Sequence, residues 1–247
     1  MKETIDDEKL LDKDYLKQKF FRSKGKQLQL FNQAMFLAAK TNNAELLGYI
    51  ISLGAQPAEI KDSLSFTPLH VAAENNCLDC AIVLIENGSE VDHHGNAHRT
   101  PLFLAASMGH SAMVSFLLNK GANPNIVDTL EGNSPLHEAA RGHFAEVCRL
   151  LIAYGADING SDIYKVVTNK YTPLDYATKH KLDFSKGLTK PTQLPYTDEQ
   201  MATVNLLLDA GAKLPLSERG QFSAEQIPNM RRLNYPEKLI EHLVNKL

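Results

Sequence analysis

The sequence has little of what marks secreted, membrane-spanning or nucleic-acid-binding proteins. Its 247 residues include three cysteines, and this small, odd number argues against a disulfide framework and for a reducing compartment. No apolar run reaches the roughly 18 residues that a transmembrane helix needs, so we expect no membrane span. The first eight residues are acidic and lack an apolar core, which predicts no secretory signal peptide.

Charge and motif content exclude further classes. The formal net charge is −3 and the sequence pI is about 6.3, which gives no general attraction to nucleic acid or anionic lipid. No glycine-rich phosphate loop, nucleophile elbow or kinase signature is present. We therefore expect a cytoplasmic protein that is not an enzyme, with no catalytic residue, no cofactor, no metal and no nucleic-acid partner.

What the sequence does contain is a phrase that occurs four times. TPLHVAA at 67–73 reappears as TPLFLAA at 100–106, as SPLHEAA at 134–140 and, more loosely, as TPLDYA at 172–177. The intervals between successive phrases are 33, 34 and 38 residues. A period in this range is typical of stacked repeats, in which each unit buries its apolar face against its neighbours.

Each repeat reads as a pair of helices. The Thr or Ser before each Pro can cap a helix, and Pro at the first helical position loses no hydrogen bond. A second apolar stripe follows, such as AIVLI at 81–85, and it ends near a glycine such as Gly88 that can take a left-handed conformation. The fold class predicted from this pattern is all-α.

This pattern resembles the ankyrin repeat family. The repeated phrase, Gly109-His110 between the two helices, and the segments GANPN at 121–125 and GADIN at 155–159 are hallmarks of that family. The resemblance covers about residues 31–215. It implies an ankyrin-repeat solenoid of about five to six helix-turn-helix repeats, with starts near residues 34, 67, 100, 134 and 172.

The ends and one insertion depart from the repeat. Residues 1–30 are expected to form a helical N-terminal cap, and residues 216–247 a C-terminal helical pair that serves as a degenerate last repeat. The segment 181–197 interrupts the fourth phrase-bearing repeat. An insertion of this kind forms a loop, which either contributes to the functional face or is a tolerated surface loop.

One cysteine and histidine pattern has the spacing of a zinc finger. Cys77 and Cys80 are followed by His93 and His98 at suitable intervals. A finger needs its cysteines on a hairpin and its histidines on a helix, whereas here the cysteines begin a second helix and the histidines lie in the loop after it. We therefore expect no zinc, and we expect Cys80 in the core.

Two further histidines and a cysteine have structural interpretations. In the ankyrin family, the histidine of the repeated phrase, here His70 and His137, bonds to the backbone of the neighbouring loop. Cys148 aligns with apolar positions and is expected to be a buried, inert thiol. A protease-like pairing of Cys148 with His137 or His143 has no local nucleophile signature to support it.

The resemblance also implies a function, which is the binding of a partner protein through loop tips and the exposed face of each first helix. The expected tip residues precede each phrase, and aromatic or arginine side chains there have the composition of an interface hot spot, unless Phe66 and Tyr171 fold back on their own loops. The expected partner-binding residues are Phe66, Arg99, Asn133 and Tyr171 at the tips, and Glu74, Asn75, Ser107, Met108 and Arg141 on the helix face.

Two alternatives stay open at this point. The chain could be an adaptor that recruits an enzyme through its N-terminal helices, or an effector of an intracellular bacterium that binds and redirects a host protein in the host cytosol. Asn125 and Asn159 lie in the loop context that asparaginyl hydroxylases modify in many ankyrin proteins, and the same asparagines also have a structural role in such loops.

Overall fold

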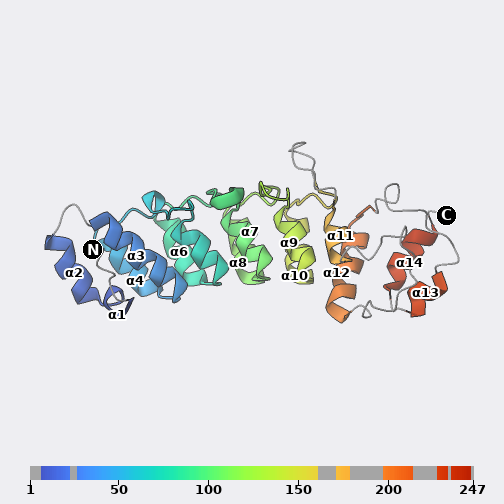
Figure 1. The fold of residues 1–247 in the computed structure, drawn as a ribbon, viewed down its shortest axis with the longest axis horizontal. Helices are drawn as coiled ribbons and strands as arrows, with labels where there is room; N and C mark the ends of the chain where they lie inside the picture. Colours follow the sequence, from blue (N-terminus) through green and yellow to red (C-terminus); the bar gives the residue numbers. More distant parts are fainter. Residues whose placement is uncertain are drawn as a thin grey trace. The chain divides into compact units, whose positions relative to one another are not determined.

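The computed structural model describes residues 7–22, 27–160, 171–178, 197–213, 227–232 and 235–245. Within these ranges the chain is made of helices joined by turns and loops, and no strand is found there, so the all-α prediction is confirmed. The chain forms two compact units, with residues 1–105 and 110–123 in unit 1 and residues 106–109 and 124–247 in unit 2. Figure 1 draws the described helices as coiled ribbons, coloured along the sequence.

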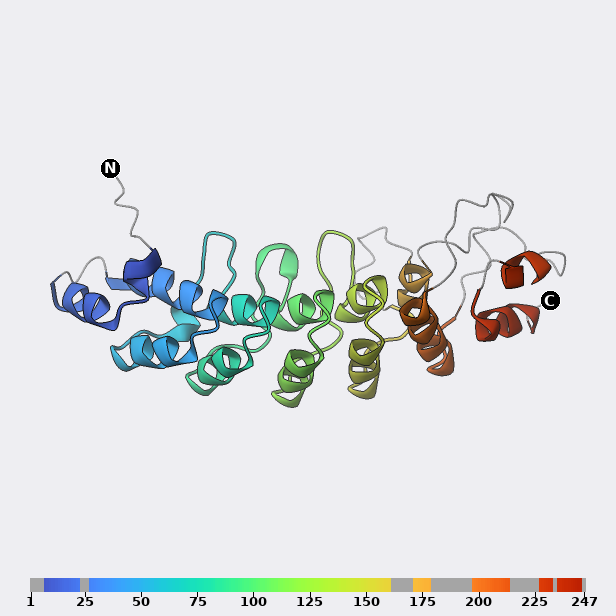
Figure 2. The ribbon, with the colours of Figure 1, turned by 90° about the horizontal axis from the view of Figure 1, so that it is seen from below.

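Unit 1 is built from pairs of short helices. These are α1 (Asp7–Leu10), α2 (Lys13–Arg22), α3 (Gln27–Lys40), α4 (Ala44–Ser52), α5 (Pro68–Glu74), α6 (Leu78–Glu86) and α8 (Ser111–Asn119), with the 3-10 turns η1 (Pro57–Glu59) and η2 (Asn96–His98) and the first five residues of α7 (Pro101–Ser107). Helix α3 packs on α4 and α5, and α6 packs on α4, α5 and α8. The loops that precede α5 and α7 lie on the same side of the helix pairs (Figure 2).

The repeated phrase fixes where the first helices begin. Thr67 is the N-cap of α5, with Pro68 at the first helical position, and Ser134 stands in the same place before α9 (Pro135–Arg141). In both cases the cap and the histidine three residues later form a capping box. The paired alanines that follow, such as Ala72 and Ala73, are fully buried, which lets neighbouring helices approach closely.

Glycine closes the second helices, as the sequence predicts. Gly88 and Gly121 follow α6 and α8 with φ of 92° and 91°, a left-handed conformation that a side chain disfavours. Each glycine amide donates to a carbonyl in the last turn of its helix. The chain can therefore reverse directly into the next loop.

The N-terminal helices are packed onto the first repeat. Leu16 of α2 is fully buried, Lys13 forms an ion pair with Glu45, and the Tyr49 hydroxyl donates to the Lys13 carbonyl at 3.3 Å. Helix α3 begins at Gln27, so a boundary between cap and repeat at residue 30 falls inside a helix.

Unit 2 continues the helix pairs. It contains α9, α10 (Ala145–Ala153), α11 (Pro173–Ala177), α12 (Asp198–Asp209), α13 (Ile227–Arg232) and α14 (Glu237–Val244). Helix α9 packs on α10 and α11, α12 packs on α10, α11 and α14, and α13 packs on α14. The insertion lies outside the described residues except for Thr197, which caps α12.

The structure corrects the expectation that the cysteines stay unpaired. Cys77 and Cys80 are joined by a disulfide, with their Cα atoms 5.3 Å apart. Cys77 is the N-cap of α6 and Cys80 lies one turn along, so the helix itself brings the two side chains together. Cys80 is fully buried, as predicted, and Cys148 is a free, buried thiol.

Candidate functional site

A cluster of charged and aromatic side chains surrounds Arg141 at the end of α9 in unit 2. Arg141 donates from Nη2 to Glu131 Oε2 at 2.7 Å, and its Nη1 lies 3.4 Å from Glu138 Oε1. The guanidinium carbon lies 4.4 Å from the centroid of the Tyr176 ring in α11. The Tyr171 ring lies 6.1 Å from the Tyr176 ring, in an edge-on arrangement. We call Glu131, Glu138, Arg141, Tyr171 and Tyr176 the Arg141 cluster.

The loop before α9 holds this cluster in place. Asp128 Oδ1 accepts the backbone N–H groups of Glu131 and Asn133, at 3.1 Å and 3.0 Å. The Asn133 side chain donates to Glu131 Oε2 and to Glu138 Oε1, both at 2.9 Å. Asn133 is only 1% exposed, because its amide is enclosed by these carboxylates. The structure therefore corrects the expected exposure of Asn133, which supports the loop from within.

Glu131 is the central acceptor of the cluster. Its Oε2 also accepts the Tyr176 hydroxyl at 3.2 Å, in addition to Arg141 and Asn133. The hydrogen bond from Arg141 lowers the pKa of Glu131, so this carboxylate stays ionised at neutral pH. Burial raises the pKa of Glu138, the second carboxylate beside Arg141. The guanidinium thus has one fixed anionic partner and one aromatic face to stack on.

Two members of the cluster remain accessible. The Arg141 side chain is 43% exposed and Tyr171 is 42% exposed, although both make the contacts described above. Met108, which directly follows α7 and belongs to unit 2, is also exposed. The predicted residues Arg141 and Tyr171 are thereby brought together by Tyr176, a residue that the sequence did not single out.

In unit 1 the predicted tip residues are packed more closely. The Phe66 ring is only partly exposed and meets the His70 ring edge-on at 5.2 Å. It lies against Gly95 of the next loop, where an added Cβ would come within 2.3 Å of the ring. Arg99 stacks on Phe103, at 5.3 Å from the guanidinium carbon to the ring centroid. Phe66 therefore folds onto the neighbouring loop and does not project from its own.

The predicted helix-face residues are more exposed. Glu74 and Asn75 are exposed at the end of α5, where the Glu74 carbonyl lies 2.9 Å from His110 Nε2 and the Asn75 amide donates to Val71 at 2.9 Å. Ser107 is partly exposed. These contacts use the Glu74 backbone and leave its carboxylate at the surface.

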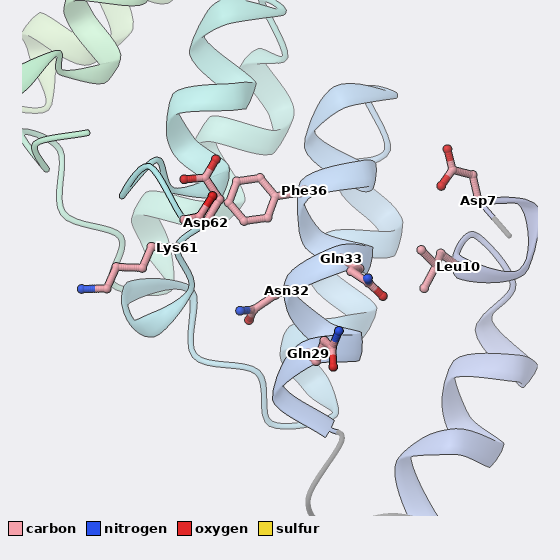
Figure 3. A pocket seen from close by; sticks show the side chains of 9 residues that line it. Asp7, Leu10, Gln29, Asn32, Gln33, Phe36, Lys61 and Asp62 are labelled. Atoms are coloured by element: carbon pink, nitrogen blue, oxygen red, sulfur yellow. The ribbon is translucent and has the colours of Figure 1, made fainter. Parts of the chain in front are cut away.

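A groove of about 670 Å³ lies at the N-terminal side of unit 1 (Figure 3). Its floor is one face of α3, and its walls come from α1 and from the loop before α5. The lining residues are Asp7, Leu10, Gln29, Asn32, Gln33, Phe36, Lys61, Asp62 and Ser63. No sequence pattern indicates this groove, because three carboxamides on one helix face are typical of an ordinary solvated surface.

The histidines of the repeated phrase are structural, as predicted. The Thr67 backbone N–H can only donate, and it lies 3.0 Å from His70 Nδ1, so Nε2 carries the proton and donates to the Arg99 carbonyl at 3.1 Å. His137 bonds in the same way to Ser134 and Tyr171. Burial lowers the pKa of each imidazole to about 4. Both ring nitrogens are thus occupied within the fold.

The cysteine and histidine pattern does not assemble as a zinc finger would require. Cys77 and Cys80 are bonded to each other, and His93 lies 3.2 Å from Glu90 in the loop after α6. Within the described ranges, no group of three or more histidine, cysteine or acidic side chains is placed to hold a metal ion. Among the same residues, no helix is both long and apolar enough to cross a bilayer.

Comparison with known proteins agrees with this architecture. A family profile described as "Ankyrin repeats (3 copies)" matches residues 16–95, 35–128 and 91–162, which together cover more than half of the chain. The chain belongs to the ankyrin repeat family. This membership accounts for the paired helices, the buried alanines and the histidine bonds from one repeat to the next loop.

Several ankyrin-containing relatives match part of the chain. The neurogenic locus notch homolog protein 2 of Homo sapiens is 34% identical over 130 residues, which is 52% of this chain and 5% of that protein. The ankyrin repeat protein FPV031 of Fowlpox virus is 30% identical over 151 residues, 59% of this chain and 43% of that protein. The ankyrin repeat protein nuc-2 of Neurospora crassa is 31% identical over 126 residues, 51% of this chain and 12% of that protein.

The chain thus spans less than half the length of each of these relatives. Ankyrin repeats form a protein–protein interaction module, so the coarse function of this ankyrin repeat protein follows from its family. The partner does not follow from it, because the matches cover less than half of each relative.

Sequence reasoning missed Glu131, Glu138 and Tyr176. A signal for two of them was present, since Glu138 and Tyr176 occupy the same fifth position of the repeated phrase, where other repeats have Val71 and Leu104. That position lies beside the neighbouring first helix in unit 2, where both side chains meet Arg141. A polar and an aromatic residue at this position in successive repeats mark a local departure from the family's apolar pattern.

Proposed function

We propose that this ankyrin repeat protein is a non-catalytic module that binds a partner protein, and that unit 2 makes the principal contact through the Arg141 cluster. One observation carries the proposal. The Arg141 guanidinium is fixed by Glu131 and stacked on Tyr176, yet its side chain remains 43% exposed beside Tyr171.

The chemistry of the cluster supports this role. Arginine and tyrosine are enriched among the residues that dominate binding energy at protein interfaces. A side chain that is already held in one conformation loses less conformational entropy when a partner binds. Arg141 is held in this way from two sides, so a partner that bonds to the guanidinium or packs on Tyr171 meets a preformed surface.

The remaining predicted residues divide into two groups under this proposal. Glu74 and Asn75 in unit 1 and Met108 in unit 2 are exposed, and Arg99 and Ser107 are partly exposed, so each can contact a partner from its own unit. Phe66 and Asn133 have a supporting role, because each packs within or bonds to a loop and thereby stabilises it.

The absence of catalytic activity is part of the proposal and has its own support. Among the residues that the structure describes, the two histidines of the repeated phrase and the three cysteines are engaged within the fold or buried. Both nitrogens of His70 and of His137 are hydrogen-bonded, Cys77 and Cys80 form a disulfide, and burial raises the pKa of Cys148 to about 12. A thiol with that pKa has almost no thiolate at neutral pH.

The packing of α1 and α2 bears on the adaptor alternative. Leu10 and Leu16 are buried and Lys13 is tied to Glu45 and Tyr49, so these helices complete unit 1. This arrangement supports the role of a cap for these helices.

Affinity capture with matched variants tests the proposal. The parent chain, the double variant Arg141→Ala/Tyr171→Ala and the control Arg149→Ala serve as baits in a cell extract, with quantitative mass spectrometry as the readout. Arg149 is a more exposed arginine on α10 that pairs only with Glu146 among the described contacts. We expect at least one protein that the parent and the control retain and the double variant loses. Equal capture by all three baits, with equal melting temperatures, contradicts the proposal.

A further inference from the structure

The groove of unit 1 presents a row of carboxamides on one face of α3. Gln29, Asn32 and Gln33 follow one another at the three- and four-residue spacing that aligns side chains on a helix, and Phe36 continues the row. Helix α1 stands on one side of this row and residues 61–63 on the other (Figure 3). The face is therefore walled, unlike an ordinary solvated helix surface.

One group on the floor lacks a partner. Asn32 Oδ1 is buried and accepts no hydrogen bond. A buried acceptor left in this state destabilises a fold, so a group that donates to it is favoured at this place. Each carboxamide of the row offers both an acceptor and a donor, which matches the alternating N–H and C=O groups of an extended main chain.

The charged residues of the walls indicate which side chains such a segment carries. Asp7 and Asp62 contribute carboxylates, and the side chain of Lys61, which also lines the groove, extends away from α3 (Figure 3). Asp62 is held in place because its Oδ1 accepts the backbone N–H groups of Leu64 and Phe66 at 2.8 Å and 2.9 Å. Phe36 also lines the groove, so its ring offers an apolar surface there.

From these observations we infer that the groove binds an extended, basic segment of a partner protein through its main chain, with Asn32 as the principal acceptor. The floor from Gln29 to Phe36 spans about 10 Å at the rise of an α-helix, which corresponds to about three residues of extended chain. A lysine or arginine of the segment is placed to meet Asp7 or Asp62, and its aliphatic stem to lie on Phe36. The inference concerns unit 1 alone and does not depend on the Arg141 cluster.

Selection from a random hexapeptide library displayed on phage, with the full chain as target, provides the probe. We expect enriched peptides to contain Lys or Arg next to an apolar residue. The enriched peptide is then synthesised with capped ends, and its affinity is measured for the parent, for Asn32→Leu and for the control Gln56→Leu, which changes an exposed carboxamide outside the groove.

The variants separate a binding role from a structural one. Leucine is similar in shape to asparagine, and Asn32→Leu removes an unpaired buried acceptor. We therefore expect the melting temperature of this variant to equal or exceed that of the parent, while its affinity for the peptide falls about tenfold or more. Replacing the peptide's amide that meets Asn32 by an ester removes one N–H donor, and it should weaken binding to the parent but not to Asn32→Leu. Gln56→Leu should bind as the parent does.

Three results overturn the inference. The first is the absence of any enriched peptide, and the second is an enriched peptide that binds Asn32→Leu as tightly as the parent. The third is a concentration-dependent dimer of the parent, seen by analytical ultracentrifugation, that Asn32→Leu abolishes, because the occupant would then be a second copy of this chain.

Discussion

His137 Nε2 donates to the carbonyl of Tyr171, 34 positions further along the chain, at a distance of 3.1 Å. The Ser134 N–H donates to the other ring nitrogen of His137 at 3.1 Å, so the imidazole links the cap of one helix to the loop before the next. In unit 1, His70 makes the equivalent link from Thr67 to Arg99. Each link needs a neutral ring, because Nδ1 must accept.

This requirement predicts a loss of stability in mild acid. Burial lowers the pKa of His70 and His137 from 6.5 to about 4, so between these values the unfolded chain binds more protons than the folded chain. The stabilisation is therefore complete above pH 6.5 and declines as the pH falls toward 4. Linkage gives about 2 kcal/mol per histidine between pH 7.5 and pH 5. Urea unfolding at both pH values measures it.

The double variant His70→Gln/His137→Gln is the control for this effect. Glutamine does not titrate, so the variant should be less stable than the parent at pH 7.5 but should lose much less stability on going to pH 5. If the parent and the variant lose the same amount of stability, the two imidazoles do not carry the pH dependence.

Gly95 should not tolerate a side chain while Phe66 is present. An alanine Cβ at this position would come within 2.3 Å of the Phe66 ring, so we expect Gly95→Ala to destabilise the fold by about 1–3 kcal/mol. In a Phe66→Ala background, Gly95→Ala should lower the free energy of unfolding much less. Chemical denaturation of the four chains of this double-mutant cycle gives the coupling, and additive effects would show that the ring does not rest on Gly95.

Gly48 provides the opposite case within the same unit. It lies inside α4, and an added Cβ would meet nothing within 4 Å. Gly48→Ala should therefore stabilise the chain by about 0.5–1 kcal/mol, because alanine loses less backbone entropy in a helix. A destabilised Gly48→Ala variant in thermal unfolding would contradict this prediction and would mean that the space beside Gly48 is occupied.

The state of the three cysteines can be counted directly. Cys148 is buried and burial raises the pKa of its thiol to about 12, so the native protein should react with a thiol reagent very slowly. After unfolding without reductant we expect one reactive thiol per chain, and after reduction three, because Cys77 and Cys80 are paired. Three thiols before reduction would show that this disulfide is absent.

The N-terminal helices should contribute to stability through Leu16. This side chain is fully buried, so Leu16→Ala should cost about 2–5 kcal/mol of unfolding free energy. Lys17→Ala, at the neighbouring exposed position of α2, is the control and should have little effect. Indistinguishable melting temperatures for the two variants would identify α2 as an appended segment and not as a cap.

The repeated phrase made much of the fold predictable. Helices α5, α7, α9 and α11 each begin at the proline of the phrase, because a capping residue and a proline act locally, whatever the rest of the chain does. The glycines after the second helices and the bonding of His70 and His137 were predictable for a similar reason, since the repeat supplies the same neighbours each time.

The candidate sites were less predictable, because they arise where repeats differ from one another. The contact of Phe66 with Gly95 joins two loops of unequal sequence, and the burial of Asn133 depends on the turn that Asp128 forms. The groove depends on α1 and residues 61–63 standing beside α3, which no local pattern encodes. The cysteine pair was misinterpreted because core spacing and disulfide spacing coincide at the start of α6.

The most direct test of the proposed function is the affinity of the captured partner for Arg141→Ala and for Arg149→Ala, measured by titration calorimetry with purified proteins. Loss of an interface arginine of the hot-spot type typically costs 2 kcal/mol or more, so we predict that Arg141→Ala binds about thirty-fold more weakly than the parent. Arg149→Ala should bind as the parent does, and both variants should fold. Equal affinities for the two variants would contradict the account and exclude the Arg141 cluster as the contact surface.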